Sequence, residues 1–102
     1  MPLDTYFRME RQSPIRHEYD QGLAYAMTGR SEDHLTITLN IGASLNGQFK
    51  KRGCKAFVEG MRVGIESESA YYYPDVVALC GEREYGPHED LVLINPMILM
   101  EI

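Results

Sequence analysis

The chain of 102 residues carries 10 lysines and arginines against 15 aspartates and glutamates, a formal net charge of −5. This length supports a single domain over residues 1–102, and 44% hydrophobic residues are enough for one small core. No apolar run approaches the roughly 20 residues that a membrane-spanning helix needs. The N-terminal residues lack the apolar stretch of a secretory signal, so we expect a cytoplasmic protein that does not associate with a membrane.

The charge is divided unevenly along the chain. Residues 1–52 carry a net charge of +1, and residues 53–102 carry a net charge of −6. A protein that holds nucleic acid by charge alone would be basic overall, and this chain is not. An acidic C-terminal half suits a site for divalent cations, because Mg²⁺ and Ca²⁺ prefer oxygen ligands. Composition leaves both kinds of function open.

The cysteine and histidine content does not point to zinc. Cys54 and Cys80 occur without a secretion signal, so we expect reduced thiols and no disulfide. Together with His17, His34 and His88 they could supply zinc ligands, but no two of them have the C-x₂-C or H-x₃-H spacing of zinc sites.

The first half of the chain predicts a short helix and a β-hairpin. Pro2 suits the first helical position, and Leu3 and Phe7 lie on one face of a helix over residues 2–11. Residues 17–28 predict the hairpin, because apolar positions flank a turn whose glycine tolerates a positive φ.

The segment that follows carries two conflicting signals. Residues 35–41 alternate between apolar and polar side chains, as a half-buried strand does. However, Ser31 is a good N-cap, acidic residues follow it, and Gly53 comes after a basic last turn. We therefore predict a helix over about 32–52, although each of its two internal glycines weakens it by up to about 1 kcal/mol.

From Cys54 onward the pattern predicts β-structure. Short apolar runs separated by turns predict strands over residues 54–58, 61–65, 71–80, 91–94 and 97–102, with a polar surface loop over residues 81–90. Continuous apolar strands are usually buried on both faces, so the last run should be covered by another element. The order of the elements is typical of an α+β or α/β fold.

Two acids stand in otherwise apolar β segments. Asp75 opens the run that ends at Cys80, and Glu101 follows residues 97–100. A carboxylate is rarely buried unless it is paired or bound to a metal. If the two strands were neighbours, both carboxylates would meet in a site for a hard cation, of the kind that cleaves phosphodiesters. Alternatively, Asp75 caps a strand end and Glu101 is solvated, and the pattern alone favours this simpler interpretation.

A set of short motifs in fixed order adds a further indication. The set covers the whole chain and consists of His17-Glu18-Tyr19 with Gly22, Gly29 with His34, Gly53-Cys54, Tyr73-Pro74-Asp75-Val76, and Pro96 before an apolar strand ending in Glu101. In this order the motifs resemble the Uma-type family of putative restriction endonucleases, which belongs to the PD-(D/E)xK nuclease superfamily.

The resemblance implies an α+β fold of the restriction-endonuclease type, with a mixed β-sheet, flanking helices and DNA as the partner. Asp75 looks like the aspartate of the Pro-Asp motif, Glu101 like the acid of (D/E)xK, and Glu18 like an additional N-terminal glutamate. These would be the catalytic residues and the ligands of Mg²⁺ or Mn²⁺. In such sites the metal lowers the pKa of the attacking water, and a lysine helps to position it.

The chain departs from this pattern at its C-terminal end. Ile102 occupies the x of (D/E)xK, so the lysine position does not exist, and the lysines present are Lys50, Lys51 and Lys55. We therefore expect a truncated family member whose metal-dependent endonuclease activity is weak or absent. The alternative is a non-catalytic oligomeric or DNA-associated remnant of the fold.

The C-terminal strand also predicts assembly. Residues 91–94 and 97–102 would form an apolar strand without the elements that cover it in the family. A bare strand exposes apolar surface and unpaired backbone groups. We expect a homodimer or higher oligomer whose contact includes this strand, because two-fold symmetry lets a second copy cover it.

Overall fold

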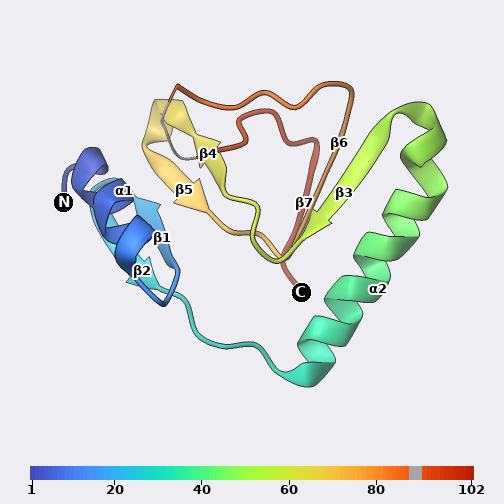
Figure 1. Cartoon of the computed structure of the whole chain (residues 1–102), viewed down its shortest axis with the longest axis horizontal. Helices are drawn as coiled ribbons and strands as arrows, with labels where there is room; N and C mark the ends of the chain where they lie inside the picture. Colours follow the sequence, from blue (N-terminus) through green and yellow to red (C-terminus); the bar gives the residue numbers. More distant parts are fainter. Residues whose placement is uncertain (88–90) are drawn as a thin grey trace.

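Two α-helices and two antiparallel sheets make up the α+β fold of residues 1–87 and 91–102, the part of the chain that this computed structural model describes (Figure 1). The helices are α1 (Leu3–Gln12) and α2 (Glu32–Phe49), and α2 continues into a short 3₁₀ turn, Lys50–Arg52. In Figure 1, α1 lies against the first sheet and α2 against the second. Neither helix, within the described ranges, is both long and apolar enough to cross a membrane.

The first sheet contains the predicted hairpin. Its strands, in the spatial order β2-β1-β5-β4, are β2 (Leu23–Ala26), β1 (His17–Asp20), β5 (Ala70–Tyr72) and β4 (Val63–Ile65). Helix α1 packs on this sheet through aromatic side chains. Tyr6 and Phe7 of the helix meet Tyr19 and Tyr71 of the sheet, and Val92 completes this core.

The second sheet carries the acids that the sequence singled out. Its order is β3-β6-β7, with β3 (Cys54–Val58), β6 (Val76–Cys80) and β7 (Ile98–Met100). Val76 pairs with Val58 on one side and with Met100 on the other. Asp75 directly precedes β6 and Glu101 directly follows β7, so the strands next to the two acids are neighbours, which is the condition that the sequence hypothesis required.

The mixed sheet implied by the family resemblance is not what the described strands form. All pairs between the named strands are antiparallel, and the parallel pairing seen in the described part is a single bridge between Val63 and Leu93. Short links explain the antiparallel pairs β1–β2 and β4–β5, whose strands follow each other directly along the chain.

The predicted strand over residues 91–94 is wrong as a regular strand. Leu93 forms isolated bridges with Val63 and Tyr85, while Val92 and Leu93 are both fully buried. Val92 belongs to the core under α1, and Leu93 packs with Val63, Val77 and Leu79 in a second core. The apolar residues at 91–94 therefore reflect burial in the core and do not form a regular strand. Of the predicted loop over residues 81–90, residues 88–90 lie outside the described part.

The predicted long helix is confirmed, and its end signals act as expected. The side chain of Ser31 accepts the backbone N–H of His34 at 3.1 Å, which caps the first turn of α2. At the other end Gly53 adopts the left-handed conformation with φ +76°, which favours glycine. The first turn of α2 lies beside the start of β6, where His34 Nε2 is 3.0 Å from Asp75 Oδ1.

Gly42 of α2 packs closely against Val58 of β3. A Cβ at this position would lie 2.4 Å from Val58 Cγ1, whereas a Cβ at Gly47 would meet nothing within 4 Å. We expect Gly42→Ala to lower the free energy of unfolding by about 1–3 kcal/mol, because overpacking outweighs the gain in helix propensity. Gly47→Ala, with the same gain and no clash, should raise it by up to about 1 kcal/mol. Urea unfolding measures both, and equal stabilisation by the two variants would contradict this packing.

The prediction of reduced thiols is wrong in the structure. Cys54 and Cys80 are directly opposite each other in the β3–β6 pairing and are joined by a disulfide. The sequence separation of 26 residues gives no hint of this proximity, which arises only from the strand register.

Candidate metal centre

Asp75 lies where the polypeptide enters β6 and is the most deeply buried acid of the site, with 2% of its surface exposed. Its Oδ2 accepts the backbone N–H of Ile102 at 2.7 Å. Its Oδ1 lies 3.0 Å from His34 Nε2 and 3.6 Å from a terminal nitrogen of Arg30. One carboxylate oxygen is thus held by the backbone beside β7, and the other faces the side chains of His34 and Arg30.

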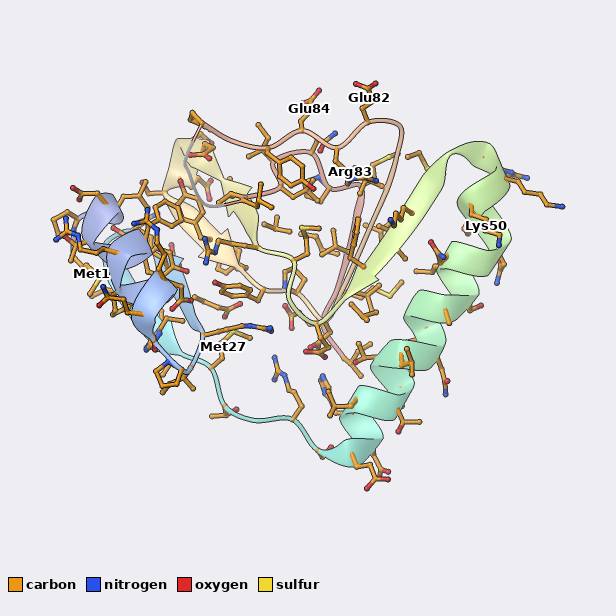
Figure 2. The ribbon with its side chains drawn as sticks, viewed as in Figure 1. Met1, Met27, Lys50, Glu82, Arg83 and Glu84 are labelled. Carbon is orange, nitrogen blue, oxygen red and sulfur yellow. A yellow bond between two sulfur atoms is a disulfide. The ribbon has the colours of Figure 1, made fainter. Side chains whose placement is uncertain are left out.

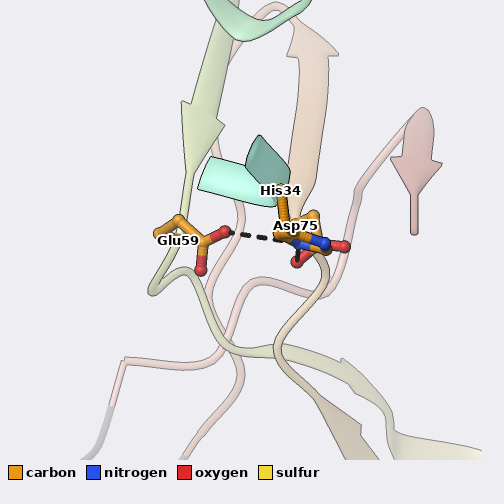
Figure 3. Close-up of side chains that lie close together, drawn as sticks. All are labelled: His34, Glu59 and Asp75. Atoms are coloured by element: carbon orange, nitrogen blue, oxygen red, sulfur yellow. Dashed lines mark ion pairs between the residues drawn. The ribbon is translucent and has the colours of Figure 1, made fainter. Parts of the chain in front are cut away.

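His34 and Glu59 approach Asp75 from two different elements (Figure 3). His34 belongs to the first turn of α2, whose cap on Ser31 fixes the backbone from which the imidazole extends. Glu59 directly follows β3, and its N–H donates to the backbone carbonyl of Asp75 at 3.2 Å. The carboxylate of Glu59 lies 4.0 Å from His34 Nε2.

The ligand atoms of this His-Glu-Asp group lack regular hydrogen bonds. Among the described residues, the buried atoms without a hydrogen-bond partner are His34 Nε2, Glu59 Oε1, Asp75 Oδ1 and the nearby Thr38 Oγ1. His34 Nε2 and Asp75 Oδ1 lie 3.0 Å apart and form an ion pair when the imidazole is protonated. Unpartnered buried polar atoms cost free energy. The group's three ligand atoms lie within 4.8 Å of one another and can hold a metal ion, which would satisfy them together.

Glu101 and Glu18 flank this group. Val76 pairs with Met100, so extending the β6–β7 register by one residue places Glu101 opposite Asp75. Glu18 extends from β1, and its carboxylate accepts the backbone N–H of Tyr73 at 3.3 Å. The structure therefore gathers the three residues predicted as ligands, although their binding of a metal stays a prediction.

The electrostatics differ between the two predicted motif acids. Burial alone would raise the pKa of Asp75, but the N–H of Ile102, the imidazole of His34 and the charge of Arg30 together hold this pKa below its usual value. Burial raises the pKa of Glu101, and the neighbouring carboxylates of Asp75 and Glu18 raise it further. Asp75 is thus a carboxylate at neutral pH, and Glu101 pays an electrostatic cost for its negative charge there.

Comparison with known proteins identifies the family. The model of the Uma2 family, described as putative restriction endonucleases, matches residues 3–102. The chain belongs to this family. An uncharacterized protein of Synechocystis sp. is 28% identical over 97 residues, which cover 95% of this chain and 55% of that protein. A second uncharacterized Synechocystis protein is 26% identical over 81 residues, with 79% of this chain and 43% of that protein covered.

This Uma2 chain thus spans about half the length of the curated relatives that it matches. No solved structure matches it.

The positively charged side chain beside Asp75 is an arginine, Arg30, and not a lysine. Lys50 and Lys51 follow α2 at the end farther from His34, where Figure 2 labels Lys50, and Lys55 lies at the start of β3, remote from Glu59. Arg30, from the segment between β2 and α2, is instead the side chain that places positive charge beside Asp75. Among the residues that the structure describes, no lysine joins the His-Glu-Asp group.

Sequence reasoning missed Glu59, Arg30 and the role of His34 at this site. Glu59 directly follows a strand that pairs with β6, so a correct β3–β6 register would have placed it beside Asp75. His34 follows a good N-cap, which fixes it in the first turn of a helix, but nothing in the sequence shows which strand that turn approaches.

Proposed function

We propose that this Uma2 protein hydrolyses phosphodiester bonds of DNA with Mg²⁺ or Mn²⁺ bound at the His-Glu-Asp group. The observation that carries the proposal is the convergence of three buried ligand atoms within 4.8 Å of one another at Asp75, next to the carboxylates of Glu101 and Glu18. A carboxylate cluster alone would not indicate which reaction the site performs. Family membership supports the reaction class, because the family is described as putative restriction endonucleases.

The proposed ligands are arranged around Asp75. Asp75 Oδ1 is central, with His34 and Glu59 on one side and with Glu101 and Glu18 as the further carboxylates. Carboxylates suit both Mg²⁺ and Mn²⁺, and an imidazole shifts the preference toward the transition metal. The bound metal would lower the pKa of an attacking water and stabilise negative charge on the phosphate.

The protein's own residues position this chemistry. The N–H of Ile102 holds Asp75 Oδ2, so that Oδ1 faces His34 and Arg30, and orienting a ligand in this way is the usual task of an outer-shell hydrogen bond. Arg30 supplies the local positive charge, but it already faces Asp75 at 3.6 Å. Because the lysines of this chain lie elsewhere, we expect cleavage by these 102 residues to be slow.

The test is a nicking assay on supercoiled plasmid. We expect slow conversion to the open circular form with Mn²⁺, less with Mg²⁺, and none with EDTA or with the Asp75→Asn variant. Saturating Mn²⁺ should also stabilise the fold, by about 2.7 kcal/mol at a free concentration of 100 times Kd. Nicking that persists in EDTA, or Mn²⁺ that neither binds nor supports nicking, would overturn the proposal.

An interaction role is a second candidate, favoured by one observation. β7 is an edge strand of the second sheet, and Ile98 and Leu99 on it are exposed apolar residues. We propose that a second copy of the chain pairs with this edge, with or without catalysis. The measurement that decides this proposal is the mass of the protein in solution.

A further inference from the structure

A pocket of about 200 Å³ adjoins the proposed metal centre. Its lining includes Arg16 from the segment before β1, Arg30 from the segment before α2, and Glu59 of the His-Glu-Asp group. We call it the arginine pocket. Its wall therefore combines two guanidinium groups from different segments with one proposed metal ligand.

Neither guanidinium is saturated by its protein partners. Arg30 is 29% exposed and places one nitrogen 3.6 Å from Asp75, which leaves other N–H donors of the group available. Arg16 lies with its guanidinium carbon 5.5 Å from the centre of the Tyr73 ring. Within the described ranges, no carboxylate forms an ion pair with Arg16. The charge of Arg16 is thus held in place by an aromatic ring and is not neutralised.

We propose that the arginine pocket binds a phosphate of the DNA backbone next to the one that is cleaved. Arginine suits this task, because its planar group can donate two parallel hydrogen bonds to phosphate oxygens. The acids around Asp75 would repel a polyanion, and positive charge is therefore needed beside them. Since Glu59 borders both the pocket and the His-Glu-Asp group, one strand can occupy the two sites with neighbouring phosphates.

This inference rests on the proposed function, but binding tests it without cleavage. The probe is a short fluorescein-labelled DNA duplex, titrated with protein in Ca²⁺ and followed by fluorescence anisotropy. We expect Arg16→Gln and Arg30→Gln each to weaken binding at least about fivefold, and to reduce the slope of log K against log salt concentration by about one unit. Arg16→Lys keeps the charge but loses the paired donors, so its affinity for DNA should lie between those of the wild type and Arg16→Gln.

Arg52→Gln is the matched control. Arg52 also stacks on an aromatic ring, with its guanidinium carbon 5.8 Å from the centre of Phe49, but it lies at the far end of α2. Arg52→Gln should change the affinity for DNA by less than about twofold, as expected for a surface charge outside the contact with DNA. Equal effects of Arg16→Gln and Arg52→Gln, or no binding of the duplex by the wild type, would overturn the arginine pocket. Arg16 is exposed, so its variant decides the question even if Arg30→Gln fails to fold.

Calorimetric titration with Mn²⁺ separates this inference from the proposed function. If Mn²⁺ does not bind but the arginine effects persist, the pocket is correct and the nuclease proposal fails. If Mn²⁺ binds and supports nicking while the arginine variants bind DNA like the wild type, the nuclease proposal is correct and the pocket fails.

Discussion

Asn in place of Asp75 is expected to weaken Mn²⁺ binding by at least about 100-fold, since loss of even an outer-shell partner costs 10- to 100-fold and Asp75 is central among the proposed ligands. The amide that replaces Oδ1 carries no charge to offset dehydration of the ion. Isothermal titration calorimetry measures the change. Glu82→Gln is the control, because Glu82 is an exposed acid in the loop after β6 (Figure 2). If Asp75→Asn and Glu82→Gln bind Mn²⁺ equally well, Asp75 is not a metal ligand.

The same variant should lose stability in the absence of metal. The pKa of Asp75 is lowered in the folded protein, because the N–H of Ile102, His34 and Arg30 outweigh the cost of burial. A lowered pKa means that the carboxylate stabilises the fold above its ordinary pKa of 3.8, and that this stability is lost as the pH falls through the folded value. At pH 7 we expect Asp75→Asn to lower the free energy of unfolding by about 1–2 kcal/mol. The difference should shrink in acid, where both proteins carry a neutral side chain.

Glu101→Gln provides a contrast within the same site. The pKa of Glu101 is raised by burial and by the carboxylates of Asp75 and Glu18. A raised pKa means that the favourable contribution is present at low pH and is lost as the pH rises through the folded value. At pH 7 we therefore expect Glu101→Gln to raise the Tm of the metal-free protein while weakening Mn²⁺ binding. A fall in both would show that the acids do not repel one another, and that Glu101 supports the fold.

The ends of α2 could be predicted because their causes are local. Ser31 and Gly53 set the helix ends by side-chain capping and backbone conformation, and both act as expected. The hypothesis that Asp75 and Glu101 meet, which the residue pattern alone did not favour, required that two apolar strands be neighbours, and β6 and β7 are. Sequence patterns were sufficient for the helix ends, whereas the strand pairing is a long-range choice that the sequence offered only as a condition.

The remaining parts depend on register and on packing between distant segments. The disulfide and the place of Glu59 both follow from how β3 aligns with β6, which no residue of either strand specifies alone. Leu93 is apolar because it fills a core, and the sequence pattern for that burial is the same as for a strand. The family resemblance pointed to Asp75, Glu101 and Glu18, whose metal binding stays a prediction, and no sequence signal showed that α2 and Arg30 reach the same place.

The chain of 102 residues is expected to sediment with a mass of at least twice 11.6 kDa. Among the strands that the structure describes, β7 has a neighbour on one side only, and Leu99 on it is 47% exposed. Beside it, an apolar hollow of about 230 Å³ lies between the end of α2 and the second sheet, with Leu45, Phe49 and Ile98 in its lining. A second copy related by a two-fold axis can pair with the same edge and cover this surface.

The energy available for this contact is large compared with the stability of a small domain. At about 25 cal/mol per Å², burial of roughly 600 Å² of apolar surface contributes about 15 kcal/mol before the entropy and orientation costs of association. Leu99→Lys should shift the sedimenting species toward monomer, because it places charge in the contact. Leu23→Lys, at an exposed leucine on the edge strand of the other sheet, should leave the mass unchanged. A wild-type monomer at micromolar concentration would contradict the proposed pairing. If Leu99→Lys and Leu23→Lys changed the sedimenting mass equally, the contact would not be at β7.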